Sequence, residues 1–320
     1  MMSNPWKLRI RLLIAMSLLF GLVYAIVLLT MSLLGFSGNF TIFVILGLGI
    51  IFLQYLLGPT IVQKTMGVRY VTEEKVPELH RMVNDLAMVA GIPKPKIGIS
   101  ETNVPNAFAF GRTKNDGRIC VTRGILNTLN KEELKAVLGH ELAHIKHNDM
   151  AVTTLVSAIP LICYYISLSF IFGGDNKNNG GIIIGILAFG AYIIGQLLVL
   201  FISRTREYYA DHGSIEIGGR PDKLTSALYK LVYGASKASK EEIKEIEGTK
   251  AFFLNDVTNA RNDIQELSQL DVDQDGEISA SDLAQLKYKK VNIKTSEKVA
   301  ELFSTHPNML KRIEKIAEYS

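Results

Sequence analysis

The residues best suited to chemistry form the pentapeptide His140-Glu141-Leu142-Ala143-His144, which has the spacing H-E-x-x-H. On a helix, residues four apart lie one above the other on a single face, so both imidazoles can bind one metal ion. Glu141 then stands beside that ion, where it can take a proton from an attacking water. The alternative is a chance match in which two helical histidines form a polar surface patch. The sequence around the motif favours the metal site.

Four uncharged apolar runs surround the motif in two close pairs. They are Leu12–Leu34, Phe40–Leu57, Met150–Phe172 and Ile182–Ile202. Each reaches or approaches the ~20 residues that are needed to cross ~30 Å of hydrocarbon. Buried core helices are the alternative, and a cleaved signal peptide is the alternative for the first run. Four runs in two pairs predict four transmembrane helices arranged as two hairpins.

Basic residues at the ends of these runs set the predicted orientation. They are Lys7, Arg9 and Arg11 before the first run, Lys64 and Arg69 after the second, and Arg204 and Arg206 after the fourth. The connections inside the hairpins carry almost no charge. We therefore expect a multi-pass protein of the cell membrane. Both termini and the segment from about Gly58 to Asp149 should face the cytoplasm.

Composition excludes several other classes of protein. The chain has 320 residues, is 48% hydrophobic and carries a formal net charge of +4. Membrane topology accounts for that charge, and no basic patch is interleaved with aromatic residues, so we expect no nucleic-acid partner. Cys120 and Cys163 form no C-x-x-C motif, which argues against a disulfide framework or a thiolate zinc site. The apolar runs lack the charged residues that usually mark an ion path, so a transporter is disfavoured.

The polar segments predict a mainly α, α+β fold with a small antiparallel sheet. Residues 96–100 alternate like a strand, and residues 106–111 and 118–122 resemble a hairpin joined through Asn115-Asp116-Gly117. Asn130 followed by Glu133 gives a helix start for the H-E-x-x-H segment. We expect a first hairpin in 1–58, two parts of a cytoplasmic domain in 59–149 and 203–320, and a second hairpin in 150–202.

A zinc hydrolase usually has three protein ligands, so the motif needs one more. A metzincin would have Gly and His where this chain has His147 and Met150, which excludes that arrangement. The other arrangement takes a Glu from a downstream helix. Glu207 and Asp211 are four residues apart, so Glu207 can bind zinc while Asp211 accepts the free N–H of a ligating histidine. The alternative for Glu207 is an ordinary surface pair with a neighbouring arginine.

Two segments together, TRGILNTLNKEELKAVLGHELAHIKHND and SRTREYYADHGS, resemble the M48 metallopeptidase family. With two hairpins in this order, the chain resembles the HtpX group within that family, and the resemblance covers most of its length. It implies a zincin-like (gluzincin) domain and a membrane-bound zinc protease that acts on misfolded or damaged membrane proteins. In this chain the zinc ligands would be His140, His144 and Glu207, with Glu141 as the general base.

Two shorter elements also resemble that family. Residues 106–111, NAFAFG, are similar to an edge strand beside the catalytic cleft, to which a substrate backbone can add as an extra strand. Asn106 is then a candidate substrate contact, or else a turn residue after Pro105. Residues 304–307, STHP, are similar to the family's T-H-P element. His306 is a candidate hydrogen-bond donor to the oxyanion, with helix capping or support of the metal ligands as alternatives.

A second ion site is predicted at residues 271–282, which follow the EF-hand calcium-loop pattern. The candidate ligands are Asp271, Asp273, Asp275, Glu277 and Asp282. The last loop position normally holds Glu, and the shorter Asp282 predicts weaker Ca²⁺ binding or a shift toward Mg²⁺. The alternative is a solvated acidic loop, and the sequence contains no second loop to pair with it.

The leading hypothesis is therefore a membrane-embedded zinc endopeptidase with its active site at the cytoplasmic face. Its partners would be the lipid bilayer and misfolded membrane-protein substrates. The rival is a catalytically silent membrane scaffold with structural zinc and calcium sites. Retention of Glu141 argues against the scaffold, because a structural site has no use for a general base.

Overall fold

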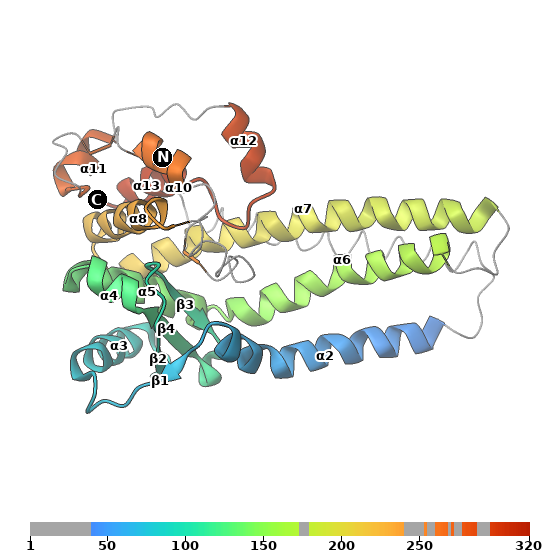
Figure 1. Cartoon of the computed structure of the whole chain (residues 1–320), viewed down its shortest axis with the longest axis horizontal. Coiled ribbons are helices and arrows are strands. Elements are labelled where there is room, and N and C mark those ends of the chain that lie inside the picture. The colour runs from blue at the N-terminus through green and yellow to red at the C-terminus, as the bar shows by residue number, and fades with distance from the viewer. Residues whose placement is uncertain are drawn as a thin grey trace.

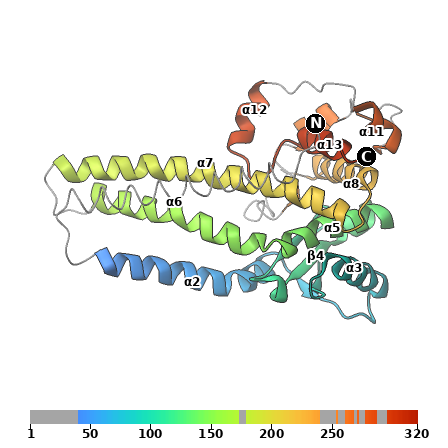
Figure 2. The same ribbon diagram turned by 180° about the vertical axis from the view of Figure 1, so that it is seen from behind.

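Three long helices run side by side away from the part of the molecule that contains the sheet (Figures 1 and 2). The structure is a computed structural model. It describes residues 40–172, 179–239, 253–254, 260–267, 270–271, 277–286 and 295–320. The long helices are α2 (Phe40–Thr65), α6 (Asp149–Phe172) and α7 (Asn179–Glu216).

Two of the described segments, Asp149–Ser167 and Gly181–Glu216, are long and apolar enough to cross a membrane. Only 33% of the apolar window of each is buried, whereas the core helix of a soluble protein is mostly buried. These helices agree with the second predicted hairpin. Helix α2 contains the predicted run Phe40–Leu57, and the run Leu12–Leu34 lies outside the described residues. Four membrane helices thus stay a prediction, of which α6 and α7 are supported.

The sheet has four short strands in the order β1-β2-β4-β3. They are β1 (Arg69–Tyr70), β2 (Lys96–Ser100), β3 (Ala107–Phe110) and β4 (Arg118–Thr122). Strands β2 and β4 are parallel, while β1–β2 and β3–β4 are antiparallel. The predicted antiparallel sheet is therefore wrong, because the sheet is mixed. The chain leaves β2, forms β3 at the edge and returns as β4 between them, so β4 runs in the direction of β2.

The predicted pairing of residues 106–111 with 118–122 is confirmed, with Ala107 opposite Val121 and Phe110 opposite Arg118. The connection is not a tight two-residue turn. It contains a 3₁₀ turn, Lys114–Asp116, and Gly117 has an ordinary φ of −64°. Arg112 and Arg118 hold the turn through Asp116, at 2.9 and 3.0 Å.

Most of the remaining helices contribute to two hydrophobic clusters. Their bounds are α3 Pro77–Ala90, α4 Arg123–Thr128, α5 Lys131–Lys146, α8 Pro221–Ser236, α10 Ala260–Leu267, α11 Ala280–Leu286, α12 Thr295–Leu302 and α13 Met309–Ala317. One cluster joins the sheet, α3 and α5 to residues of α7 and α8, and the other joins residues of the sheet and α5 to α8, α10, α11 and α13. Residues from the two sequence regions on either side of the α6–α7 pair thus form one domain (Figure 1).

Candidate metal centre

The H-E-x-x-H motif lies in the last two turns of α5. The helix starts with the predicted capping box: the Asn130 side chain accepts from the Glu133 backbone, and the Glu133 side chain accepts from the Asn130 backbone. Leu138, Leu142 and Ile145 are fully buried in the cluster beneath the sheet. Burial of this face fixes the rotation of α5. His140 and Glu141 are consequently buried as well.

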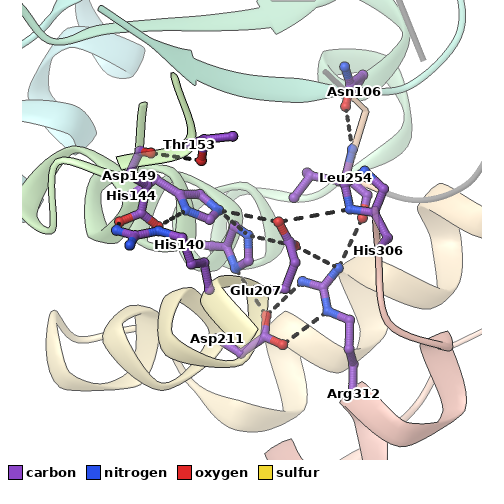
Figure 3. A network of polar contacts seen from close by, with 11 residues as sticks. Asn106, His140, His144, Asp149, Thr153, Glu207, Asp211, Leu254, His306 and Arg312 are labelled. Atoms are coloured by element: carbon purple, nitrogen blue, oxygen red, sulfur yellow. Dashed lines mark hydrogen bonds and ion pairs between the residues drawn. The ribbon is translucent and has the colours of Figure 1, made fainter. Parts of the chain in front are cut away.

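Small residues allow α5 and α7 to cross closely. A Cβ atom on Gly139 would come within 3.0 Å of Ser214 Oγ, and one on Gly213 would lie 2.5 Å from Ala143 Cβ. Ser214 Oγ donates a hydrogen bond to the Ala136 carbonyl at 2.6 Å, across the same contact. The close crossing brings the carboxylates of α7 to the histidines of α5 (Figure 3).

His140, His144 and Glu207 converge, with one potential ligand atom of each lying within 4.8 Å of the others. The two Nε2 atoms are 3.1 Å apart. The Glu207 carboxylate oxygens lie 3.6 Å from His140 Nε2 and 3.7 Å from His144 Nε2. The side chains come from two helices that are far apart in the sequence.

Each histidine has a carboxylate on its other nitrogen. His140 Nδ1 lies 3.0 Å from Asp211 Oδ1, and His144 Nδ1 lies 2.7 Å from Asp149 Oδ2. A carboxylate at Nδ1 holds the proton there and directs the Nε2 lone pair toward the centre of the group. Asp211 thus lies next to a ring nitrogen of His140, at the position where we expect it to support a ligating histidine. The equivalent role of Asp149 was not predicted.

The three facing atoms suit a metal ion. A tetrahedral zinc site with bonds of ~2.1 Å separates its ligand atoms by ~3.4 Å, close to the 3.1–3.7 Å observed. Two lone pairs and a carboxylate that face each other also need a positive charge between them. Burial alone would lower the pKa of His140, but the carboxylates of Asp211 and Glu207 raise it to about 9.

Arg312 on α13 connects the two carboxylates of α7. Its side chain is fully buried, donates to both oxygens of Asp211 at 3.0 and 2.7 Å, and lies 3.3 Å from Glu207 Oε2. The same guanidinium donates to the Leu254 carbonyl at 2.9 Å. Charge-assisted, bidentate pairs of this kind fix geometry as well as charge. Arg312 therefore holds both carboxylates in place from behind (Figure 3).

Glu141 points into a cavity of about 350 Å³ that reaches the group of three. Strand β3 forms one wall, and residues of α2, α6 and α7 form the others. Burial raises the pKa of the Glu141 carboxyl. A carboxylate whose pKa is raised toward neutrality is a better proton acceptor for catalysis. The geometry suits a base that acts beside the metal.

His306 lines the same cavity, and its Nδ1 lies 3.8 Å from Glu207 Oε1. The structure therefore brings this predicted residue to the centre. Asn106 is placed differently: it is fully buried, and its amide oxygen accepts from the Leu254 backbone at 3.0 Å. Its side chain supports the segment 253–254 at the cavity wall.

The predicted calcium loop is only partly described, because Asp273 and Asp275 lie outside the described residues. Tyr229 donates to Asp271 at 3.3 Å, and Lys230 donates to Glu277 at 2.6 Å. Asp282 accepts from both the backbone and the hydroxyl of Ser279 at the start of α11, at 2.9 and 2.7 Å. Each described carboxylate of the loop thus has a protein donor.

Comparison with known proteins identifies relatives along most of the chain. Residues 73–320 match Peptidase family M48. The chain is 63% identical over 229 residues to "Protease HtpX homolog" of Methanothermobacter thermautotrophicus, a match covering 72% of this chain and 87% of the other. It is 32% identical over 322 residues to "Protease HtpX homolog 2" of Methanosarcina mazei, covering 98% and 97%. Among solved structures, S. mikatae Ste24p matches at 18% identity with a TM-score of 0.48, covering 97% of this chain and 66% of that one.

Proposed function

The chain belongs to peptidase family M48, and on that premise we propose that it is a membrane-embedded zinc endopeptidase. The observation that carries the proposal is the convergence of His140, His144 and Glu207 with Glu141 beside them in one cavity. We propose the first three as zinc ligands and Glu141 as the general base. Asp211 positions His140 by accepting from its Nδ1.

A zinc ion bound there supplies a Lewis acid that polarises the scissile carbonyl and makes water a nucleophile near neutral pH. Glu141 takes the proton of the attacking water and delivers it to the leaving amine. His306 lies on the opposite side of Glu207 from the α5 histidines (Figure 3) and is the candidate donor to the oxyanion. Arg312 keeps the carboxylates of Glu207 and Asp211 charged and fixes their positions.

The substrate is proposed to be an extended segment of a misfolded or damaged membrane protein. Strand β3 is an edge strand of the sheet, and all of its residues line the cavity that contains Glu141. A free strand edge can pair with an extended peptide through main-chain hydrogen bonds, which needs no particular side chain. This mode suits an enzyme that must accept many unfolded sequences.

We propose that the site faces the cytoplasm at the membrane surface. The support is the distribution of basic residues around the apolar runs. The cavity is also lined by residues near the ends of the apolar runs in α2, α6 and α7, such as Tyr55, Thr153 and Ser203. In the proposed division, 59–149 and 203–320 form the protease domain, and 1–58 and 150–202 form the membrane hairpins.

Hydrolysis of casein or of an unfolded membrane protein in detergent tests the proposal. Glu141→Gln should keep the zinc and lower the rate of cleavage by ~10²–10⁴-fold or more. Glu132→Gln is the matched control, since Glu132 is exposed at the start of the same helix and should not affect the rate. A chelator should abolish cleavage, and added zinc should restore it. Cleavage by Glu141→Gln at the wild-type rate would favour the scaffold alternative.

A weak Ca²⁺ or Mg²⁺ site at 271–282 remains part of the proposal. Its support is the spacing of the acidic residues, with Asp282 as the short last ligand. Binding would draw Glu277 away from Lys230, which also contacts the buried Glu133 of the α5 capping box at 2.8 Å. An ion in the loop would therefore act on the start of the helix that carries the metal ligands.

A further inference from the structure

Helix α12 exposes three large apolar side chains. Val299, Leu302 and Phe303 are 53%, 52% and 69% exposed. They are spaced i, i+3, i+4, so they lie on one face of the helix and its C-terminal end. A clustered apolar face of this kind indicates a contact with another apolar surface, unlike single exposed residues.

The position of α12 is set by Arg204. Its Nη1 donates to the carbonyls of Glu301, Leu302 and Ser304, at 2.7, 3.3 and 2.7 Å. These are carbonyls at the end of α12, where a helix has no intrahelical donors left. Arg204 lies two residues after Ile202, where the apolar run of α7 ends. The end of α12 is thereby fixed at the level where α7 leaves its apolar segment.

The apolar face of α12 continues onto α7. Phe201 and Leu302 line one cavity of about 210 Å³ between the two helices, and Phe201 is itself exposed. The opposite side of α12 faces the domain, where Glu301 pairs with Lys311. Helix α12 runs across the direction of α7 at the end of the domain from which the long helices project (Figures 1 and 2).

We propose that α12 lies in the plane of the membrane, at the boundary between lipid headgroups and acyl chains. Val299, Leu302 and Phe303 insert among the acyl chains, as the apolar face of an interfacial helix does to a depth of ~5–10 Å. The exposed Lys298 adds attraction to anionic headgroups. The proposal rests on the membrane placement of α7 within the proposed function, and is independent of proteolysis.

Contact with the bilayer would also help to hold the segment that carries His306 in place at the catalytic cleft. Residues 304–306 follow α12 directly, and the Ser304 hydroxyl accepts from the His306 backbone at 3.2 Å. The His306 ring then lies against Glu207. Lipid contact and Arg204 together fix the segment that carries His306 to the membrane surface.

Fluorescence quenching by brominated lipids tests the proposal on the full chain in single-copy nanodiscs of phosphatidylcholine and phosphatidylglycerol. The one native tryptophan is removed by Trp6→Phe, and Phe303→Trp then places an indole at the tip of α12. Bromines near the carbonyl end of the acyl chains should lower its emission at least ~twofold, and bromines near the methyl end should lower it less. Met88→Trp on α3, 65% exposed at the original side chain, is the negative control and should not be quenched.

Ile186→Trp, in the apolar run of α7 and 60% exposed at the original side chain, separates the possible failures. Quenching of Ile186→Trp without quenching of Phe303→Trp would overturn the interfacial helix and leave the membrane placement of α7 intact. If neither variant is quenched, the membrane placement fails and the proposal fails with it. Blue-shifted but unquenched emission from Phe303→Trp would show that protein, rather than lipid, covers α12.

Discussion

Two regions of this chain have the residue spacing of ion-binding sites, and their carboxylates have different surroundings in the structure. At the H-E-x-x-H centre, two imidazole nitrogens and a carboxylate face each other. At the loop 271–282, the described carboxylates face protein donors: a tyrosine hydroxyl, a lysine, and the backbone and side chain of a serine. The imidazole nitrogens and the carboxylate at the centre face a common point that suits a cation, whereas the described carboxylates of the loop each face a protein donor.

The difference extends to the surroundings of each group. Around the candidate metal centre, Asp149, Asp211 and Arg312 are all buried and contact the proposed ligand residues. In the loop, Asp282 caps α11, and the Glu277–Lys230 pair is partly exposed. A spacing motif therefore marks a strong site only where a second layer of buried groups orients the first.

The largest effect is expected from removing the charge behind the centre. Arg312→Met leaves the carboxylates of Asp211 and Glu207 buried without their counter-ion, which should lower the free energy of unfolding by ~3–5 kcal/mol. Thermal unfolding in detergent measures the change. Arg220→Met is the control, because the Arg220 side chain is 61% exposed where it pairs with Asp222, and its loss should matter by at most ~1 kcal/mol. Equal melting temperatures for Arg312→Met and Arg220→Met would mean that the buried carboxylates of the centre do not need their counter-ion. The difference between the H-E-x-x-H centre and the loop 271–282 would then be lost.

A smaller effect is expected from changing Asp149, the carboxylate that orients His144. Asp149→Asn keeps the shape of the side chain but weakens its hold on His144 Nδ1, and should reduce zinc affinity ~10–100-fold. Competition with a chromogenic chelator measures that affinity. Asp116→Asn removes a carboxylate that binds two arginines near the surface, and should leave zinc affinity unchanged. Unchanged affinity in Asp149→Asn would mean that the contact with His144 does not support the metal.

The smallest effect is expected at the loop. With a dissociation constant of ~1 mM, 10 mM Ca²⁺ should stabilise the domain by only ~1.4 kcal/mol. Lys230→Met frees Glu277 from its competing ion pair and should enlarge the shift in melting temperature. If neither protein responds to Ca²⁺, the loop carboxylates serve only as caps and ion pairs. A large Ca²⁺-induced shift in the melting temperature of the wild type would mean that the loop is a strong ion site, as the candidate metal centre is expected to be.

The sequence predicted the residues that meet at the centre but missed part of what holds them. His140, His144 and Asp211 could be placed because helical spacing defines their faces. Asp149 carries a weaker signal, as an acidic residue at the border of an uncharged run. Arg312 could have been noticed because it shares the helical stripe of Met309, Ile313 and Ile316. Neither signal says which distant carboxylate the side chain meets.

The sheet shows the same limit. Alternation predicted β2, β3 and β4, and the pairing of β3 with β4 followed from their proximity in the sequence. The insertion of β4 between β2 and β3 makes one pair parallel, and strand order depends on tertiary packing that a local pattern does not encode. Likewise, the motif of residues 106–111 predicted an edge strand, but not that Asn106 would be buried against Leu254.

Metal analysis of the purified protein tests the central claim most directly. The wild type and Glu141→Gln should each hold about one zinc ion per chain, since Glu141 is proposed as a base and not as a ligand. Glu207→Gln should lose the zinc while it remains folded in detergent. Full zinc content in Glu207→Gln, or its loss in Glu141→Gln, would contradict the account of the centre.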